Sequence, residues 1–240
     1  MLITENLGKK YGDFTAVEQL NLEVKEGAIF GFLGHNGAGK TTTISMLTTL
    51  ILPTQGSASI GGCDIVKDNF KVRSMLGYLP ESVSLYGDLT AVENLRFFGK
   101  LSRVEKVDAA IAEVLKLLGM AEWKNRKVKT YSKGMKQRIG IAQAILHKPK
   151  LLFLDEPTSG LDPQGAKDMR DILQMLNSQW GTTIFMNTHL LSEVTKLCTD
   201  IGIISHGRLL IADSLANIER KFPEAKSLEE IYFKVEGEKP

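Results

Sequence analysis

Cysteines, excess charge and long apolar runs are all scarce in this 240-residue chain, and each shortage excludes a class of protein. The two cysteines, Cys63 and Cys198, lack the spacing of a disulfide framework or a zinc site, so we expect a reducing compartment. The 30 basic and 28 acidic residues leave a net charge of +2, which argues against nucleic-acid binding as the main role. No window approaches the ~20 apolar residues of a membrane helix, and the N-terminus lacks the pattern of a secretory leader.

The composition is that of a globular protein, with 43% hydrophobic and 24% charged residues. Short apolar runs alternate with amphipathic segments, which predicts an α/β fold in which helices pack on a largely parallel sheet. An N-terminal antiparallel β region is expected to precede the central strand at 28–33. We expect strands at 2–7, 15–17, 20–24, 28–33, 151–154, 183–187, 201–205 and 208–213, and a helix at 163–179.

The segment from about 89 to 147 has a different character, because strand-like runs disappear from it. Ile111, Val114, Leu115 and Leu118 fall on one helical face, which predicts an inserted helical subdomain. We therefore divide a single domain, 1–240, into a core (about 1–88 and 149–215), a helical subdomain (about 89–148) and a small C-terminal appendage (about 216–240).

A glycine-rich segment follows the apolar run at 28–33 and opens a helix, which is the context of a phosphate-binding P-loop. Its backbone amides and the helix N-terminus attract phosphate. We expect Lys40 to reach the β- and γ-phosphates, Thr41 to offer its hydroxyl to Mg²⁺ and Thr42 to hydrogen-bond a phosphate. An incidental glycine-rich turn with this pattern has a chance frequency on the order of one in a hundred. The expected binding residues of this loop are Gly34, His35, Asn36, Gly37, Ala38, Gly39, Lys40, Thr41 and Thr42.

A second apolar strand ends in two acids, Asp155 and Glu156. Asp155 is expected to hold Mg²⁺, directly or through water, and Glu156 to act as the general base that positions the attacking water. An acidic pair at a strand end is as often a solvated turn or a helix cap. The accompanying P-loop favours the functional interpretation.

A third motif separates the classes of nucleotide-binding proteins that share the first two. The segment Tyr-Ser-Lys-Gly-Met-Lys-Gln-Arg begins at position 131 and opens a helix that runs to about 147. It resembles the signature motif of the ABC ATPase family, usually Leu-Ser-Gly-Gly-Gln. Ser132 can cap this helix, whose amides and dipole can face the γ-phosphate of a nucleotide held by another subunit. The signature residues expected at the nucleotide are Ser132, Lys133, Gly134 and Met135. A capped surface helix is the alternative for this motif taken alone.

Further family elements follow in the expected order, so the resemblance extends over about 1–215. Tyr11 matches the aromatic residue that stacks on adenine. The segment 77–81 resembles the loop that joins the core to the helical subdomain, with Glu81 in place of the usual glutamine and metal contact. The segment 159–162 resembles the loop that contacts the opposite subunit. His189 matches the switch histidine that contacts the γ-phosphate and completes the catalytic set Lys40, Glu156 and His189.

The resemblance implies an ATPase subunit of an ABC transporter. Its expected ligands are ATP and Mg²⁺, and its expected partners are a second ATPase subunit, in a homodimer, and a membrane-spanning permease. It would then be cytoplasmic and peripheral on the inner face of the cell membrane, with no nucleic acid expected. Lys133 and Met135 replace a signature glycine and glutamine, and these departures and Glu81 resemble bacterial drug- and lipid-efflux subunits, which favours export.

Three rival functions remain at this stage. A non-transport ABC ATPase of DNA repair, chromosome organisation or translation typically adds a coiled-coil insertion, zinc-binding cysteines or a second ATPase copy, and this sequence has none of them. A GTPase would carry an Asn-Lys-x-Asp motif, which is absent, and a nucleotide kinase is disfavoured by the signature. A regulatory module without hydrolysis is disfavoured because Lys40, Asp155, Glu156 and His189 are all present. The transported substrate depends on the permease.

Overall fold

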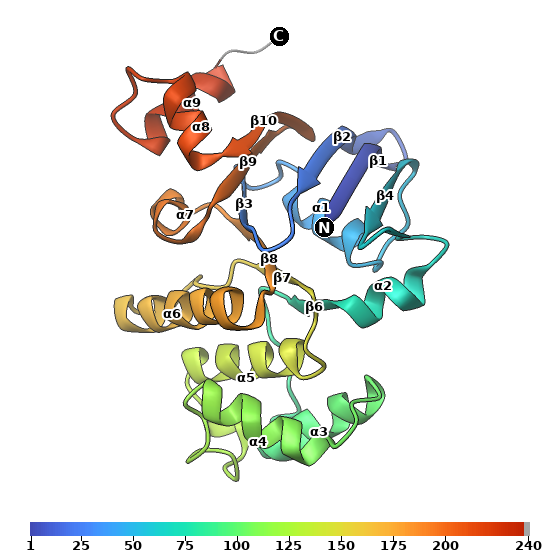
Figure 1. The fold of residues 1–240 in the computed structure, drawn as a ribbon, viewed down its shortest axis with the longest axis vertical. Helices are drawn as coiled ribbons and strands as arrows, with labels where there is room; N and C mark the ends of the chain where they lie inside the picture. Colours follow the sequence, from blue (N-terminus) through green and yellow to red (C-terminus); the bar gives the residue numbers. More distant parts are fainter. Residues whose placement is uncertain (238–240) are drawn as a thin grey trace.

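The computed structural model describes residues 1–237, which form two sheets and a separate layer of helices (Figure 1). The smaller sheet has four strands in the order β2-β1-β4-β5, and all its pairs are antiparallel. Buried and exposed residues alternate along much of β2, as in a strand with one face on a core. This sheet confirms the expected N-terminal antiparallel region. Its strands are β1 (Leu2–Tyr11), β2 (Phe14–Val24), β4 (Gln55–Ile60) and β5 (Cys63–Asp64).

The larger sheet has six strands in the order β10-β9-β3-β8-β7-β6, and only the β10 edge is antiparallel. Every residue of β3, β7 and β8 is buried, which explains their continuous apolar sequences. These three strands are parallel neighbours, so their carboxyl ends meet at one edge of the sheet. The strands are β3 (Ile29–Leu33), β6 (Leu76–Leu79), β7 (Leu151–Asp155), β8 (Thr183–Thr188), β9 (Asp200–Ser205) and β10 (Arg208–Ser214).

Helices follow the parallel strands in chain order. The longest, α6 (Pro163–Trp180), starts at Asp162, whose side chain accepts a hydrogen bond from the Gly165 amide, and ends at Gly181 in the left-handed conformation. Its first helical residue is proline, the position at which the missing amide costs nothing. The other helices of the core are α1 (Lys40–Leu47), α2 (Asn69–Met75) and α7 (Leu191–Leu197).

The chain between β6 and β7 forms the helical layer, drawn in green and yellow at the lower end of Figure 1. A capping box between Thr90 and Glu93 starts its first helix. Ile111, Val114 and Leu115 are buried, as their spacing predicts. The elements of this layer are α3 (Ala91–Leu101), α4 (Val107–Leu117), the 3₁₀ turn η1 (Val128–Thr130) and α5 (Lys133–Ile145).

Several strands differ from the sequence expectation for identifiable reasons. The segments 15–17 and 20–24 are one strand, because a residue with positive φ, Gln19 at 48°, interrupts the alternation without ending the strand. β4 was not expected, since Gln-Gly-Ser-Ala-Ser reads as a loop. β6 has four residues, and a Cβ at its Gly77 would lie 2.3 Å from the Ala144 carbonyl oxygen, so glycine is needed for α5 to approach.

Two short helices end the described chain, α8 (Leu215–Lys221) and α9 (Leu228–Gly237), drawn in red in Figure 1. The expected appendage, 216–240, begins within α8, and its residues 238–240 lie outside the described part. Ile218, Leu228 and Ile231 are buried in the same hydrophobic cluster as Val194 of α7. Within residues 1–237, no helix combines the length and the apolar character needed to span a membrane.

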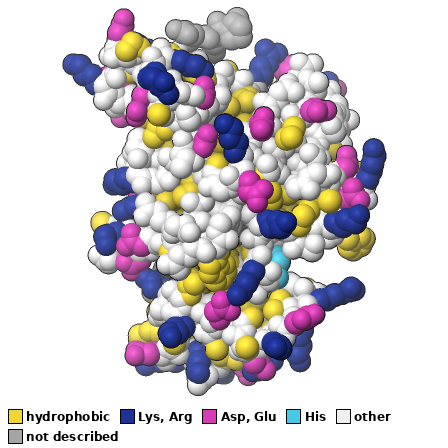
Figure 2. Space-filling model, viewed as in Figure 1, with side chains coloured by type: hydrophobic (Ala, Val, Ile, Leu, Met, Phe, Trp, Pro, Cys, Tyr) yellow, Lys and Arg dark blue, Asp and Glu magenta, His cyan; other side chains and the backbone are white. Residues whose placement is uncertain are grey.

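Charged side chains of both signs cover the surface. On the face shown in Figure 2, basic and acidic groups are interspersed over both sheets and the helical layer. This mixture agrees with the small net charge of +2.

Candidate active site

The P-loop connects β3 to α1, and its glycines have steric reasons to be there. Gly37 and Gly39 have φ of 84° and 107°, a region that side chains disfavour. A Cβ at Gly39 would lie 2.6 Å from the Ala16 carbonyl oxygen, and one at Gly34 would lie 2.4 Å from that of Ile204. The loop is therefore pressed against β2 and β9, which fixes the N-terminus of α1.

Lys40 is the first residue of α1 and is buried. Its Nζ donates hydrogen bonds to the carbonyl oxygens of Gly34 at 2.7 Å and His35 at 3.0 Å. Burial lowers the pKa of Lys40, and the nearby carboxylates of Glu156 and Asp155 oppose this fall. A poorly hydrated cation thus lies along the loop, where it would interact strongly with phosphate.

Asp155 ends β7 directly beside Asn187 of β8. The Asn187 Nδ2 donates to Asp155 Oδ1 at 2.5 Å. Burial raises the pKa of Asp155; the Asn187 bond and Lys40 lower it, and Glu81 and Glu156 raise it further. The charge effect of Glu81 places its carboxyl group near this strand end, although it comes from a different segment of the chain.

Glu156 follows in a strained backbone conformation, with φ of 50° in a residue other than glycine. Its amide donates to the Asn187 carbonyl oxygen at 3.0 Å. Its carboxylate accepts hydrogen bonds from His189 Nδ1 at 2.8 Å and from Thr188 Oγ1 at 3.3 Å. The backbone strain and the two donors together aim a buried carboxylate at one point, as expected for a functional group.

These groups line one cavity of about 480 Å³. Ten of the residues expected at the site are in its wall, so the structure brings together the P-loop, both acids, Glu81 and His189. The wall consists of Phe14, Ala16, Asn36, Gly37, Gly39, Lys40, Thr41, Thr42, Glu81, Asp155, Glu156, Asn187 and His189. Gly34, His35 and Ala38 belong to the loop but are not in the wall.

The signature residues lie elsewhere. Ser132 is the N-cap of α5, and its side chain accepts a hydrogen bond from the Met135 amide at 3.2 Å. Ser132, Gly134 and Met135 line a second depression of about 330 Å³, together with Leu161 and Asp162 of the 159–162 loop. The two walls have no residue in common.

Comparisons with known proteins identify the family. The family described as "ABC transporter" matches residues 17–159. The bacitracin transport ATP-binding protein BcrA of Bacillus licheniformis is 45% identical over 224 residues, which are 92% of this chain and 73% of BcrA. The linearmycin resistance ATP-binding protein LnrL of Bacillus subtilis (strain 168) is 42% identical, over 88% of this chain and 68% of LnrL. This chain is an ABC ATPase.

Solved structures agree with this identification. A structure titled "Structure of ATP binding subunit of ABC transporter" superposes with a TM-score of 0.88 and 28% identity, over 98% of this chain and 99% of the other. The ATP-binding cassette MJ0796 superposes with a TM-score of 0.80 and 26% identity over 90% of this chain and 99% of its own. Two of its structures are described as dimeric, and one of these is a post-hydrolysis state bound to ADP and Pi. The family confirms the expected fold, ATP as ligand and the ATPase activity, and it disfavours the non-transport alternative.

Two aromatic residues of this ABC ATPase, Tyr11 and Phe14, lie near the nucleotide cavity. Tyr11 is half exposed and is not in the cavity wall; the Nζ of Lys9 lies 5.2 Å from the centre of its ring. Phe14, its partner across the β1–β2 turn, lines the cavity and is 64% exposed. Sequence reasoning missed Phe14, because the two rings flank the same short turn and spacing alone does not rank them. The adenine-stacking role of Tyr11 stays a prediction.

Asn187 was also missed as a site residue. It stands two residues before His189 in the sequence, and it bonds both Asp155 and the Glu156 backbone. The signal that could have found it is its position at the end of the adjacent parallel strand, where it pairs directly with Asp155.

Proposed function

We propose that this ABC ATPase hydrolyses ATP at composite sites of a homodimer and thereby drives export by a separate membrane-spanning partner. The observation that carries the proposal is the separation of Lys40 and Ser132 into two depressions with no shared wall residue. A γ-phosphate bound by Lys40 is not enclosed within one chain. A second subunit that presents its α5 N-terminus would complete the site.

The P-loop would hold the phosphates through the α1 N-terminus and Lys40. Mg²⁺ fits the donors Thr41, Asp155 and Glu81, which offer the hydroxyl and carboxylate oxygens that it prefers. The buried Oδ1 of Asn187, which has no partner among the described residues, adds a further oxygen. Among residues 1–237, no cluster of three His, Cys, Asp or Glu side chains able to hold a metal occurs. When bound, the ion neutralises phosphate charge.

Glu156 would act as the general base. As the water oxygen bonds to the γ-phosphorus, its proton passes to the Glu156 carboxylate, and the bond to the bridging oxygen breaks to leave ADP and phosphate. His189 and Thr188 donate to this carboxylate, so they fix its orientation. His189 is half exposed, which leaves its ring accessible to the γ-phosphate.

The signature residues would act on the nucleotide of the opposite subunit. Ser132 and the amides of Lys133, Gly134 and Met135 form the first turn of α5, where the helix dipole favours an anion. The amine of Lys133 also lies against Gly160, since a Cβ there would be 2.3 Å from Nζ. Lys133 thus connects the signature to the loop expected to contact the partner.

A third cavity, which is mainly apolar, is suited to a helical segment of the permease. It has a volume of about 400 Å³ and lies beside the exposed aromatic rings of Tyr86 and Phe97. The 77–81 segment lines this cavity with Tyr78 and Pro80 and lines the nucleotide cavity with Glu81. One loop therefore contacts both cavities, which gives the ATP cycle a route to the partner.

Export is supported by the names of the relatives, which include a bacitracin transport protein and a linearmycin resistance protein. We propose that the ATPase works at the inner face of the cell membrane with its permease and exports an antibiotic. Cells in which Lys40→Ala replaces the wild-type chain should become more sensitive to antibiotics of this kind, such as bacitracin and linearmycin. Unchanged sensitivity to a panel of them would exclude this substrate class.

Glu156→Gln tests the ATPase mechanism. The amide cannot accept a proton but leaves Lys40 untouched, so turnover should fall by at least about 100-fold while ATP affinity changes by no more than about twofold. Bound ATP would persist, and the variant should elute from a sizing column as a dimer only with ATP. Normal turnover would remove Glu156 from its role, and a monomer under saturating ATP would contradict the dimer.

A further inference from the structure

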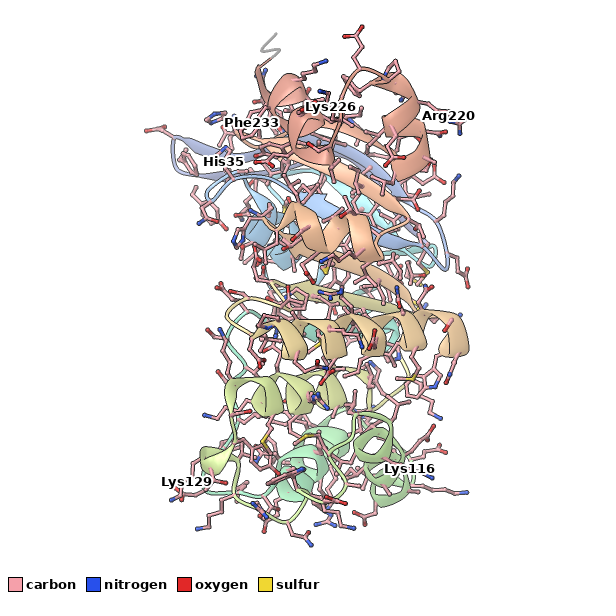
Figure 3. The ribbon with its side chains drawn as sticks, turned by 90° about the vertical axis from the view of Figure 1, so that its left-hand side faces the viewer. His35, Lys116, Lys129, Arg220, Lys226 and Phe233 are labelled. Carbon is pink, nitrogen blue, oxygen red and sulfur yellow. The ribbon has the colours of Figure 1, made fainter. Side chains whose placement is uncertain are left out.

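The last helix, α9, contacts the P-loop at His35, a residue that does not line the nucleotide cavity. The Nε2 of His35 lies 4.0 Å from the Oε1 of Glu236, and the rings of His35 and His206 are 5.0 Å apart. Figure 3 shows His35 next to the end of the molecule that carries α9, where Phe233 is labelled. A segment about 200 positions later in the chain, the separation of these residue numbers, thus lies against the phosphate-binding loop.

Two donors hold the Glu236 carboxylate in place. Ser205 Oγ donates to its Oε1 at 3.2 Å, and Tyr232 Oη donates to the same atom at 3.5 Å. Tyr232 lies one helical turn before Glu236. Burial raises the pKa of Tyr232, Glu236 adds to the rise, and the His35 backbone amide opposes it, so the hydroxyl stays neutral beside both groups.

The hydrogen bonds of His35 orient its ring toward this carboxylate. Its Nδ1 lies 2.7 Å from the Asn36 carbonyl oxygen, which can only accept, so Nδ1 is the donor. The Nε2 atom is buried and has no hydrogen-bond partner among the described residues. The Nε2 edge of the ring therefore faces the Glu236 carboxylate across 4.0 Å.

The turn between β9 and β10 provides a second route from α9 to the loop. Ser205 binds Glu236, His206 packs on His35, and the Gly207 amide donates to the Ala38 carbonyl oxygen at 2.9 Å. Three consecutive residues therefore connect α9 to both ends of the P-loop. His35 therefore contacts α9 through its ring, and its carbonyl oxygen accepts a hydrogen bond from Lys40.

We propose that Glu236 and Tyr232 are positioning residues for ATP binding, which hold the P-loop through His35 and the β9–β10 turn. The inference rests on the assignment of the P-loop as the ATP site. Neither residue lines the nucleotide cavity, so both act by keeping the loop amides aligned before ATP arrives. Their loss should weaken ATP binding and leave the chemical step unchanged.

The first test is Glu236→Gln in the full chain, which removes the charge and keeps the size. The Kd for trinitrophenyl-ATP, followed by fluorescence, should rise by roughly 2- to 10-fold, the range of one hydrogen bond to a held group. The KM for ATP should rise in parallel, while kcat stays within about twofold. Glu229→Gln is the matched control, because Glu229 is an exposed residue of the same helix, and its Kd should equal that of the wild type.

A double-mutant cycle separates positioning from a general loss of structure. If the contact with His35 carries part of the effect, Glu236→Gln should change Kd by a smaller factor in a His35→Gln background than in the wild type. Equal changes in both backgrounds would overturn the proposal. Tyr232→Phe removes one hydrogen-bond donor to Glu236 and keeps the ring. It provides a second test in case the Glu236 variant fails to fold. An unchanged Kd in folded Tyr232→Phe protein would also count against the proposal.

The Lys40→Ala variant distinguishes this inference from the proposed function. If Lys40→Ala binds the nucleotide as the wild type does, the P-loop is not the site and the proposed function fails. If Lys40→Ala loses binding while Glu236→Gln and Tyr232→Phe behave as the wild type, only the role of α9 is wrong.

Discussion

At the scale of single residues, the site contains two buried groups of opposite charge, Asp155 and Lys40. Burial raises the pKa of Asp155 and lowers that of Lys40, so each ionised group is disfavoured by its surroundings and favoured by the other. For Asp155 the unfavourable effects prevail. Ionised Asp155 therefore costs stability at neutral pH, as expected for a group kept for function.

Asp155→Asn should accordingly stabilise the protein at neutral pH and abolish turnover. Between the ordinary pKa of 3.8 and the raised native one, the native state binds more protons than the unfolded state, so stability falls as pH rises through this window. Above it, asparagine removes the cost. Thermal melting without nucleotide should show the variant more stable at about pH 7.5, with a smaller gain at about pH 4.5. A variant less stable than the wild type at the higher pH would contradict the sign.

A measurement of ATP affinity can show which of the two rings, Phe14 or Tyr11, stacks on the adenine. Base–aromatic stacking is worth ~1–3 kcal/mol, so removal of the stacking ring should weaken ATP binding by roughly 5- to 100-fold. Because Phe14 lines the cavity, we expect Phe14→Ala to weaken binding more than Phe14→Tyr does. Tyr11→Ala and Tyr11→Phe form the comparison pair. A loss confined to Tyr11→Ala would support the sequence prediction and assign Phe14 to packing.

The sequence predicted which residues gather at the candidate site better than it predicted the contacts that support them. Lys40, Asp155 and Glu156 were expected because each stands in a local motif, at a fixed offset from a buried strand. Asn187 and the Glu236–His35 contact were not, because they join segments far apart in sequence, and no local pattern encodes which strand ends or helices become neighbours. Tertiary contacts of this kind depend on the strand order.

At the scale of elements, two serines allow the capping of a helix to be separated from the proposed role of a helix N-terminus in catalysis. Ser132 caps α5 and Ser214 caps α8, and each side chain accepts a hydrogen bond from the amide three residues later at 3.2 Å. Substitution by alanine should cost each helix ~1 kcal/mol of stability. Only Ser132→Ala should also lower ATPase activity, by roughly tenfold or more. Equal activities of the two variants would reduce Ser132 to a cap.

The fold was predictable wherever the sequence of an element contains its own pattern of apolar residues or caps. β3, β7 and β8 each contain a short apolar run, and α6 has an Asp cap, a first-turn proline and a terminal glycine. β6 escaped notice because four residues that include Gly77 form a strand only when β7 and α5 are already beside them. Short elements of this kind depend on tertiary contacts more than on propensity.

At the scale of the whole molecule, the two halves of the proposed site belong to different parts of the fold. The Lys40 cavity is formed mainly by the edge of the parallel sheet, and the Ser132 depression by the helical layer and the loop before α6. Such a division is useful if ATP joins two subunits and hydrolysis releases them. The closing and opening of this joint would be the movement passed to the permease through the 77–81 loop.

Mixing of two inactive variants tests whether the site is shared. In a shared site, a mixed dimer of Lys40→Ala and Ser132→Ala has one site with both lesions and one site with none, so ATPase activity should return when subunits exchange. If each chain held a complete site, every site would carry one lesion and mixing would restore nothing. Recovery therefore excludes sites within one chain. A lack of recovery does not by itself distinguish the two arrangements, because a dimer in which both sites must hydrolyse ATP together would also stay inactive.

Cross-linking decides that case. Cysteines at Ser132 and Asn36, in a background that lacks Cys63 and Cys198, should join two chains only when ATP is bound. Asn36 is chosen because it is exposed in the P-loop, whereas a side chain at Gly34 would meet the Ile204 carbonyl oxygen at 2.4 Å. Denaturing electrophoresis would show the product at twice the mass of one chain. Cross-links found only within single chains would refute the shared site, because the Ser132 depression would then close on the P-loop of its own subunit.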